Sequence, residues 1–231
     1  MIGFALFAVA LATATFFSNG GLLTAWTLEG LTLIGLAVWT RRRRYQAAGI
    51  AYFAITAVHL FSFETPLRHL FTERAHPAQN IGALLLVIGA LALAAALLHG
   101  RELLFPRLDL AAAGIASLFA LFAVSLTVLE ASQRIGAADL HAKFQRGETS
   151  VSVLWAIVAL ALLASGLTSR SKEFRYAGLA LLGCALAKLF LFDLSQLSSL
   201  SRAASFLAVG LALLAGGFLV QRFAAGGRRT S

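Results

Sequence analysis

Long runs of apolar residues constrain this chain more than any other feature of its sequence. Each run approaches the ~20 residues that an α-helix needs to cross the ~30 Å hydrocarbon layer of a bilayer. Eight of them follow one another, at about residues 2–17, 22–40, 47–63, 81–99, 110–129, 151–168, 176–192 and 203–220. Because backbone polar groups in lipid must be satisfied within the segment, each run is predicted to be a transmembrane helix. The predicted fold is therefore an all-α integral membrane protein with eight spans.

The composition supports this class of fold and excludes several others. Only 13% of the residues are charged, against about 25% in a typical soluble domain. The net charge of +9 does not indicate nucleic-acid binding, because the basic residues lie between the apolar runs. The sequence has no Walker loop, His-Glu-x-x-His, Cys-x-x-Cys or Gly-x-Ser-x-Gly pattern, so no enzyme chemistry follows from a motif. The histidines offer no predicted haem or metal pair, and no cofactor is expected.

Basic residues in the connections between spans predict the orientation of the chain. Cytoplasmic loops of membrane proteins are enriched in lysine and arginine. Twelve basic residues fall on one predicted side: Arg41, Arg42, Arg43, Arg44, Arg101, Arg107, Arg170, Lys172, Arg175, Arg222, Arg228 and Arg229. Six fall on the other: Arg68, Arg74, Arg134, Lys143, Arg146 and Arg202. This asymmetry predicts that both termini are cytoplasmic. Trp26 and Trp155 are then expected as anchors at the opposite membrane interface. Arg41 to Arg44 are expected to fix the topology of the chain, and recognition of anionic lipid headgroups is the alternative interpretation.

An internal repeat is visible in the sequence. The string FALFAVAL at 4–11 returns as FALFAVSL at 119–126, and a second, ungapped match runs at a separation of 129 residues. The second match pairs Trp26 with Trp155, then Arg41 with Arg170, and Glu64 with Asp193. We therefore expect two four-helix repeats, residues 1–105 and 106–231, within one membrane domain. An even number of spans gives both halves the same orientation, so the repeats are predicted to be parallel.

Three ionisable residues lie within predicted spans, where such groups indicate functional sites by default. Glu29, His59 and Lys188 are expected at nearly one depth, about 8–10 Å below the non-cytoplasmic surface at 1.5 Å per residue. His59 is the repeat partner of Lys188, whereas Glu29 faces Val158 in the alignment and has no acidic counterpart. This asymmetry suggests an ion pair between Glu29 and Lys188 across the two halves. A snorkelling lysine or a purely structural pair is the alternative interpretation.

Further polar residues complete the candidate site near the same surface. Asp193 and Arg202 follow the seventh span, where Asp193 matches Glu64 as a boundary acid. The charged segment between the fifth and sixth spans, residues 130–150, is interpreted as a long loop, and such loops often carry function. Cys184 is expected to be a small buried residue of the core.

The second half of the chain resembles a family of large bacterial multi-pass membrane proteins, domain-of-unknown-function family 2339. The resemblance is close over about residues 150–222. It rests on Trp155, Arg175, Gly178, Lys188, Leu189, Phe190, Asp193, Leu197, Arg202, Ser205, Phe206, Gly210, Gln221 and Arg222. The segment AWTLEGLTLIG at 25–35 is more loosely similar, through Trp26, Glu29 and Gly30. Members of the family are usually longer and have more spans. Because the family is uncharacterised, the resemblance implies a fold and motif positions but no reaction.

Three classes of function remain open from the sequence. The first is a structural or accessory subunit of a complex in the bacterial inner membrane, in contact with the bilayer and with partner subunits. The second is a small-solute or lipid transporter with an outward-facing polar site at Glu29, His59 and Lys188. The third is a membrane enzyme that modifies envelope lipids or glycans through Asp193, Arg202 and the 130–150 segment.

Overall fold

The computed structural model describes residues 20–73, 75–100, 107–135 and 139–189, with a few single positions outside these ranges. All regular structure in these ranges is helical. The predicted spans 2–17 and 203–220 lie outside them, apart from those single positions. The chain divides by packing into two compact units, residues 1–130 and residues 131–231. Whether the repeat boundary near residue 105 is correct stays a prediction.

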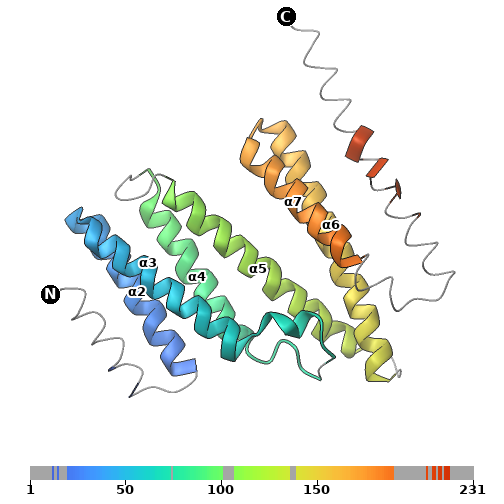
Figure 1. Cartoon of the computed structure of the whole chain (residues 1–231), viewed down its shortest axis with the longest axis horizontal. Coiled ribbons are helices and arrows are strands. Elements are labelled where there is room, and N and C mark those ends of the chain that lie inside the picture. The colour runs from blue at the N-terminus through green and yellow to red at the C-terminus, as the bar shows by residue number, and fades with distance from the viewer. Residues whose placement is uncertain are drawn as a thin grey trace, which may run out of the picture. The chain divides into compact units, whose positions relative to one another are not determined.

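Four long helices form the first unit (Figure 1). They are α2 (Gly20–Thr40), α3 (Arg43–His59), α4 (Ile81–Leu98) and α5 (Leu108–Gln133), of which α5 ends just past the unit boundary. A π-helical turn, η1 (Leu60–Glu64), prolongs α3, and a 3₁₀ turn, η2 (Leu67–Leu70), follows it. Helix α2 packs against both α3 and α4. We call one end of this helix group the arginine end, because it includes Arg41 to Arg44. Helices α2 and α4 end there, and α3 and α5 begin there.

The second unit contains one described helical hairpin. Helix α6 (Leu140–Thr168) packs along α7 (Lys172–Lys188), as Figure 1 shows in yellow and orange. Residues 130–150 are therefore not a long loop, as the sequence analysis expected, because helices α5 and α6 cover most of them. The Asp139 side chain accepts a hydrogen bond from the Ala142 amide at 3.1 Å and so caps the start of α6.

Five of the described helical segments are long and apolar enough to cross a membrane. They are Gly21–Thr40, Arg43–Glu64, Ile81–Leu98, Leu108–Gln133 and Leu140–Thr168. Each matches a predicted span. Helix α7 corresponds to the predicted span 176–192, but its 17 residues end where the described range ends. Several hydroxyl groups within the spans bond the backbone one turn earlier, as Thr27 does with the Leu23 carbonyl at 2.6 Å and Ser125 with the Leu121 carbonyl at 2.7 Å, so these groups are satisfied without water.

The hairpin of α2 and α3 resembles the hairpin of α6 and α7 at positions 129 residues apart. Arg41 and Arg170 both adopt φ 54° in the connecting turn, a left-handed conformation uncommon outside glycine. Helices α3 and α7 begin at Arg43 and Lys172, which are 129 apart, and end at His59 and Lys188, again 129 apart. The residue after each end, Leu60 or Leu189, has π-helical geometry.

The close contacts of the two hairpins also correspond. A Cβ atom on Gly49 would approach Ile34 side-chain atoms at 2.9 Å and the Gly30 carbonyl at 3.1 Å. A Cβ atom on Gly178 would approach Leu163 atoms at 2.8 Å and the Ala159 carbonyl oxygen at 2.9 Å. The residues in the first set of contacts, Gly49, Ile34 and Gly30, correspond to Gly178, Leu163 and Ala159 at a separation of 129 in each case. Small residues at helix contacts let the backbones approach closely, and at Gly178 the backbone of α6 itself leaves no room for a Cβ atom, whereas at Gly49 the nearest atoms belong to the Ile34 side chain.

Candidate functional site

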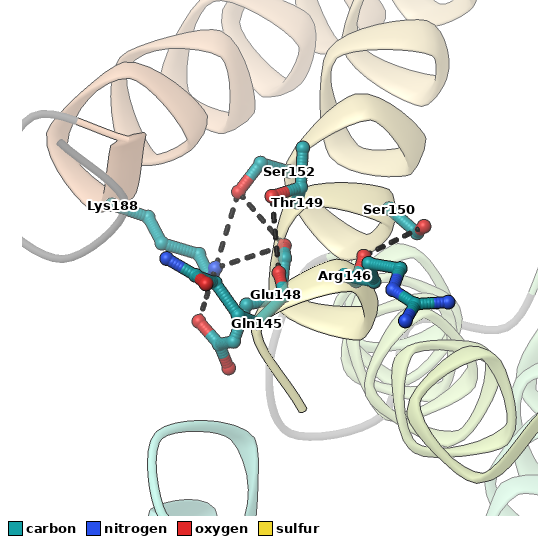
Figure 2. Close-up of polar contacts among 7 residues, drawn as sticks. All are labelled: Gln145, Arg146, Glu148, Thr149, Ser150, Ser152 and Lys188. Carbon is teal, nitrogen blue, oxygen red and sulfur yellow. Dashed lines mark hydrogen bonds and ion pairs between the residues drawn. The ribbon is translucent and has the colours of Figure 1, made fainter. Parts of the chain in front are cut away.

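Lys188 ends α7 and reaches across to α6, where it is almost completely buried (Figure 2). Its Nζ donates to Glu148 Oε2 at 2.7 Å, to Ser152 Oγ at 3.1 Å and to the Glu148 carbonyl at 3.3 Å. Ser152 Oγ in turn donates to the Glu148 carbonyl at 3.2 Å. An ammonium group has three N–H donors, and all three have acceptors here. Lys188, Glu148 and Ser152 are called the α6–α7 polar cluster below.

The burial of this cluster identifies its physical role. Lys188 is 3% exposed and Glu148 is 8% exposed, so the amine does not snorkel along lipid to the headgroups. The acid that the structure places on Lys188 is Glu148, rather than the expected Glu29. A buried charge is costly unless it is paired and hydrogen-bonded. The cluster meets both conditions within one hairpin and ties the end of α7 to α6.

Sequence reasoning missed Glu148 because it assigned residues 130–150 to a loop. Two signals favoured a helix there. Asp139 is a preferred N-cap residue, and no proline follows it before the apolar run of α6. Once the helix is extended to Leu140, Glu148 and Ser152 stand four residues apart on one face. That face is the one that α7 covers.

Glu29 and His59 lie in a second polar cluster, between α2 and α3. Tyr52 on α3 forms a side-chain hydrogen bond with Glu29 on α2. The His59 ring packs edge-to-face against Trp26, with ring centroids 5.7 Å apart, and at a tilt of 38° against Phe63, with centroids 5.0 Å apart. Trp26, Glu29, Tyr52 and His59, together with the buried Thr56, are called the α2–α3 polar cluster.

The α2–α3 polar cluster contains buried polar atoms that lack a hydrogen bond to any described residue. Trp26 Nε1, Thr56 Oγ1 and His59 Nε2 are buried, and the described part of the chain offers them no hydrogen-bond partner. His59 is also followed directly by the π-helical turn η1, a distortion frequent at functional sites. The structure thus brings Glu29 and His59 onto one helix pair.

Two cavities are bordered by described residues of the first unit. The larger, about 200 Å³, is lined only by apolar side chains from α2, α3, α4 and α5. The smaller, about 120 Å³, lies beyond the end of α3 and is lined by polar groups, among them Arg68, His69 and His76. Two interactions hold its rim: Asn80 Nδ2 donates to the Glu64 carbonyl at 2.9 Å, and His76 Nδ1 lies 3.4 Å from Glu130 Oε1. Neither cavity is lined by a residue of the α6–α7 polar cluster.

The remaining predicted site residues are more widely distributed. Asp193 and Arg202 lie outside the described residues. Trp155 lies on α6 and is partly buried, and the four arginines from Arg41 to Arg44 are exposed at the arginine end. Cys184 is exposed on α7 rather than buried as expected, because the buried face of α7 is the one that carries Gly178, Ala185 and Lys188. Within the described residues, no three His, Cys, Asp or Glu side chains gather closely enough to hold a metal ion.

Comparison with protein families gives a match over residues 77–223 to the family described as predicted membrane protein, domain of unknown function 2339. The chain belongs to this family. The match covers both helices of the α6–α7 hairpin and extends further toward the N-terminus than the resemblance seen over residues 150–222. It does not include α2 and α3, so the looser similarity around Trp26 and Glu29 lies outside it. No curated protein and no solved structure matches the chain.

Family membership and the apolar helices together make this a membrane protein in contact with the lipid bilayer. The family description assigns no reaction, so the geometry of the chain has to carry any functional argument.

Proposed function

We propose that the chain is a structural or accessory subunit of a complex in the bacterial inner membrane. The observation that carries this proposal is the α6–α7 polar cluster, in which all three N–H donors of the Lys188 amine have acceptors on α6. A residue that binds a solute or relays a proton has to face a pathway for it. Lys188 is sealed within a hairpin and lines neither of the two cavities, so it serves the packing of the protein.

The architecture proposed for this subunit is eight spans in two parallel four-helix repeats. The equal turn geometry at Arg41 and Arg170 and the matched contacts at Gly49 and Gly178 support it. The basic residues of the sequence support cytoplasmic termini, which would make the arginine end the cytoplasmic end. Arg41 to Arg44 would then lie among the anionic headgroups of that leaflet.

A transporter with an outward-facing polar site is the second candidate. The α2–α3 polar cluster favours it, because His59 Nε2 and Thr56 Oγ1 are buried polar atoms that a bound solute would satisfy. The polar cavity near Arg68 lies beyond the same end of α3. The third candidate, an envelope-modifying enzyme, has less support, because its proposed loop at residues 130–150 is largely helical.

Purification in mild detergent separates the first two candidates. We expect the wild-type chain to elute with a partner protein in fixed stoichiometry, and mass spectrometry identifies that partner. The control is an unrelated membrane protein with the same tag, which should not elute with the partner. The exchanged variant Glu148→Lys/Lys188→Glu keeps the pair with its polarity reversed, and we expect it to retain the partner, whereas Lys188→Glu alone should lose it. A homogeneous particle that contains only this chain and a bound small solute would contradict the subunit and favour the transporter.

A further inference from the structure

Helix α5 contacts the rest of the first unit at its start and again near its middle. At the arginine end, Leu108 packs against the core cluster of Ile34, Ala94 and Leu98. Further along, Phe119 and Phe122 meet Phe61 of η1 edge-to-face, with ring centroids 5.0 and 5.6 Å apart. The apolar cavity of about 200 Å³ occupies the interval between these two contacts.

Small side chains create this cavity. The α3 wall includes Ala54 and Ala57, and the α5 wall includes Ala111 and Ala112. Of the lining residues, Ala54, Ala111 and Ile115 are exposed. The cavity therefore opens sideways between α3 and α5, where a spanning protein faces the acyl chains of the bilayer. An apolar cavity of even ~150 Å³ excludes water and accepts apolar guests, and an unfilled one leaves its lining without dispersion contacts.

The cavity has the length of one leaflet. Its lining on α5 runs from Leu108 to Phe119, eleven residues or about 16 Å at 1.5 Å per residue. Half of the ~30 Å hydrocarbon core is ~15 Å. The cavity thus extends from the arginine end to about the middle of the bilayer, which is the depth that one acyl chain of that leaflet occupies.

Basic side chains stand at the end of the cavity where a lipid headgroup would lie. Arg107 directly precedes the first α5 residue of the lining and is exposed. On α3, Arg43 precedes Ile50, Ala54 and Ala57 by 7, 11 and 14 residues, spacings that place all four on one face of a helix. Arg43 and Arg107 therefore lie at the end of the cavity where the phosphate of a bound lipid would be placed, and arginine is a preferred partner for phosphate.

We propose that this cavity binds one acyl chain of an anionic phospholipid whose headgroup contacts Arg43 and Arg107. The headgroup part of this inference rests on the orientation and lipid contact given under the proposed function. The acyl-chain part rests on the cavity alone. The site is distinct from both polar clusters and gives the proposed subunit a fixed annular lipid that fills the gap between α5 and α3.

Native mass spectrometry of the protein from nanodiscs tests this site. The probes are phosphatidylglycerol and phosphatidylcholine with the same acyl chains. We expect wild type to retain a tightly bound lipid and to prefer phosphatidylglycerol. Ala112→Phe fills the cavity from α5, and Ala54→Phe fills it from its exposed side; both should lose the retained lipid. Ala113→Phe and Ala51→Phe are the matched controls, since Ala113 and Ala51 are exposed on the same helices but do not line the cavity, and they should retain it.

The headgroup contact is tested separately with Arg43→Gln and its neighbour Arg44→Gln. We expect Arg43→Gln to lower the preference for phosphatidylglycerol about fivefold, the effect of one basic residue at a membrane surface, and Arg44→Gln to lower it less. If Arg43→Gln and Arg44→Gln lower the preference for phosphatidylglycerol equally, the headgroup contact is overturned. The alanine-to-phenylalanine variants would still test the acyl-chain site. Retention of lipid by both cavity-filling variants at the level of their controls would overturn the acyl-chain site. The acyl-chain site would also be overturned if the wild-type protein retains no lipid and the variant Ala112→Phe has a different oligomeric state. A second copy of this chain would then be the occupant of the cavity.

Discussion

The hairpins α2–α3 and α6–α7 share a backbone and differ in how their buried polar groups are satisfied. Both turn through an arginine with φ 54°, and both pack through a glycine, Gly49 or Gly178. In α6–α7, however, Lys188 has an ion pair and two further hydrogen bonds. In α2–α3, His59 stands at the equivalent position and packs against aromatic rings.

The same helical hairpin thus accommodates a lysine or a histidine at the end of its second helix. A lysine there needs a carboxylate within reach, and α6 provides one by beginning twelve residues before Ser152 and presenting Glu148. Position 19, the counterpart of Glu148, is an asparagine in the first half. A lysine at this place brings an ammonium group, whose burial without a carboxylate is costly, and the first half has no lysine there.

The largest expected effect comes from breaking the α6–α7 polar cluster. Lys188→Met leaves Glu148 buried without its cation, and we expect a loss of about 3–5 kcal/mol in unfolding free energy. Equilibrium unfolding in mixed detergent micelles measures it. The double variant Lys188→Met/Glu148→Leu removes both charges and should recover most of the loss. If the single and double variants lose equal stability, the pair is not the source of the effect.

A glycine-to-alanine comparison tests the packing of the two hairpins. Gly178→Ala places a methyl group 2.8 Å from the Leu163 backbone nitrogen and 2.9 Å from the Ala159 carbonyl oxygen, neither of which can rotate away. We expect a loss of about 1–3 kcal/mol. Gly49→Ala should cost less, because its closest contacts at 2.9 Å are with the flexible Ile34 side chain.

Gly183→Ala is the control for both glycine variants, since nothing lies within 4 Å of the added atom. It should stabilise α7 slightly through helix propensity. Thermal unfolding of the three variants side by side orders them, and a larger loss for Gly49→Ala than for Gly178→Ala would contradict the asymmetry described here.

His59→Phe sharpens the contrast at the ends of α3 and α7. The ring keeps its contacts with Trp26 and Phe63, and the buried Nε2 atom is removed. We expect a gain of about 1 kcal/mol, because an unsatisfied buried polar group is lost. Lys188→Phe is the opposed case and should destabilise. A marked loss of stability in His59→Phe, measured by the same unfolding assay, would show that His59 Nε2 has a partner that matters.

The smallest expected effect concerns the two arginine turns. Arg170→Gly removes the strain of a left-handed residue, about 1–2 kcal/mol, but adds backbone entropy to the unfolded chain worth about 0.5–1 kcal/mol. The net gain should be about 0.5 kcal/mol, with an equal gain for Arg41→Gly if the turns are equivalent. Arg170→Ala, which keeps the strain, is the control. Thermal unfolding of matched samples measures these changes. If only one of the two glycine variants gains stability, the two arginine turns are not equivalent.

Much of the helical architecture follows from the sequence because length and hydropathy are local properties. The predicted span 22–40 differs from α2 by two residues at its start, and 81–99 differs from α4 by one at its end. The segment 130–150 was assigned wrongly because its charges resemble those of a loop. Local capping by Asp139 outweighs that polarity, and α6 continues through it.

The candidate site was only partly predictable for a related reason. Lys188, Glu29 and His59 could be singled out from the sequence, since each is an ionisable group within an apolar run. Their partners could not be derived in the same way. Lys188 pairs with an acid forty residues earlier, and Glu29 interacts with Tyr52 of the next helix. Both contacts depend on which helix faces pack together.

The sequence by itself determined that the chain is a membrane protein, about where its described spans lie, and that Glu29, His59 and Lys188 are ionisable groups within them. These properties are encoded in the order and polarity of neighbouring residues. Only the tertiary structure decided that Glu148 neutralises Lys188 and that α5 leaves an apolar cavity beside α3. Such features depend on the rotation and separation of packed helices, which small residues such as Gly178 and Ala112 set and which hydropathy does not specify.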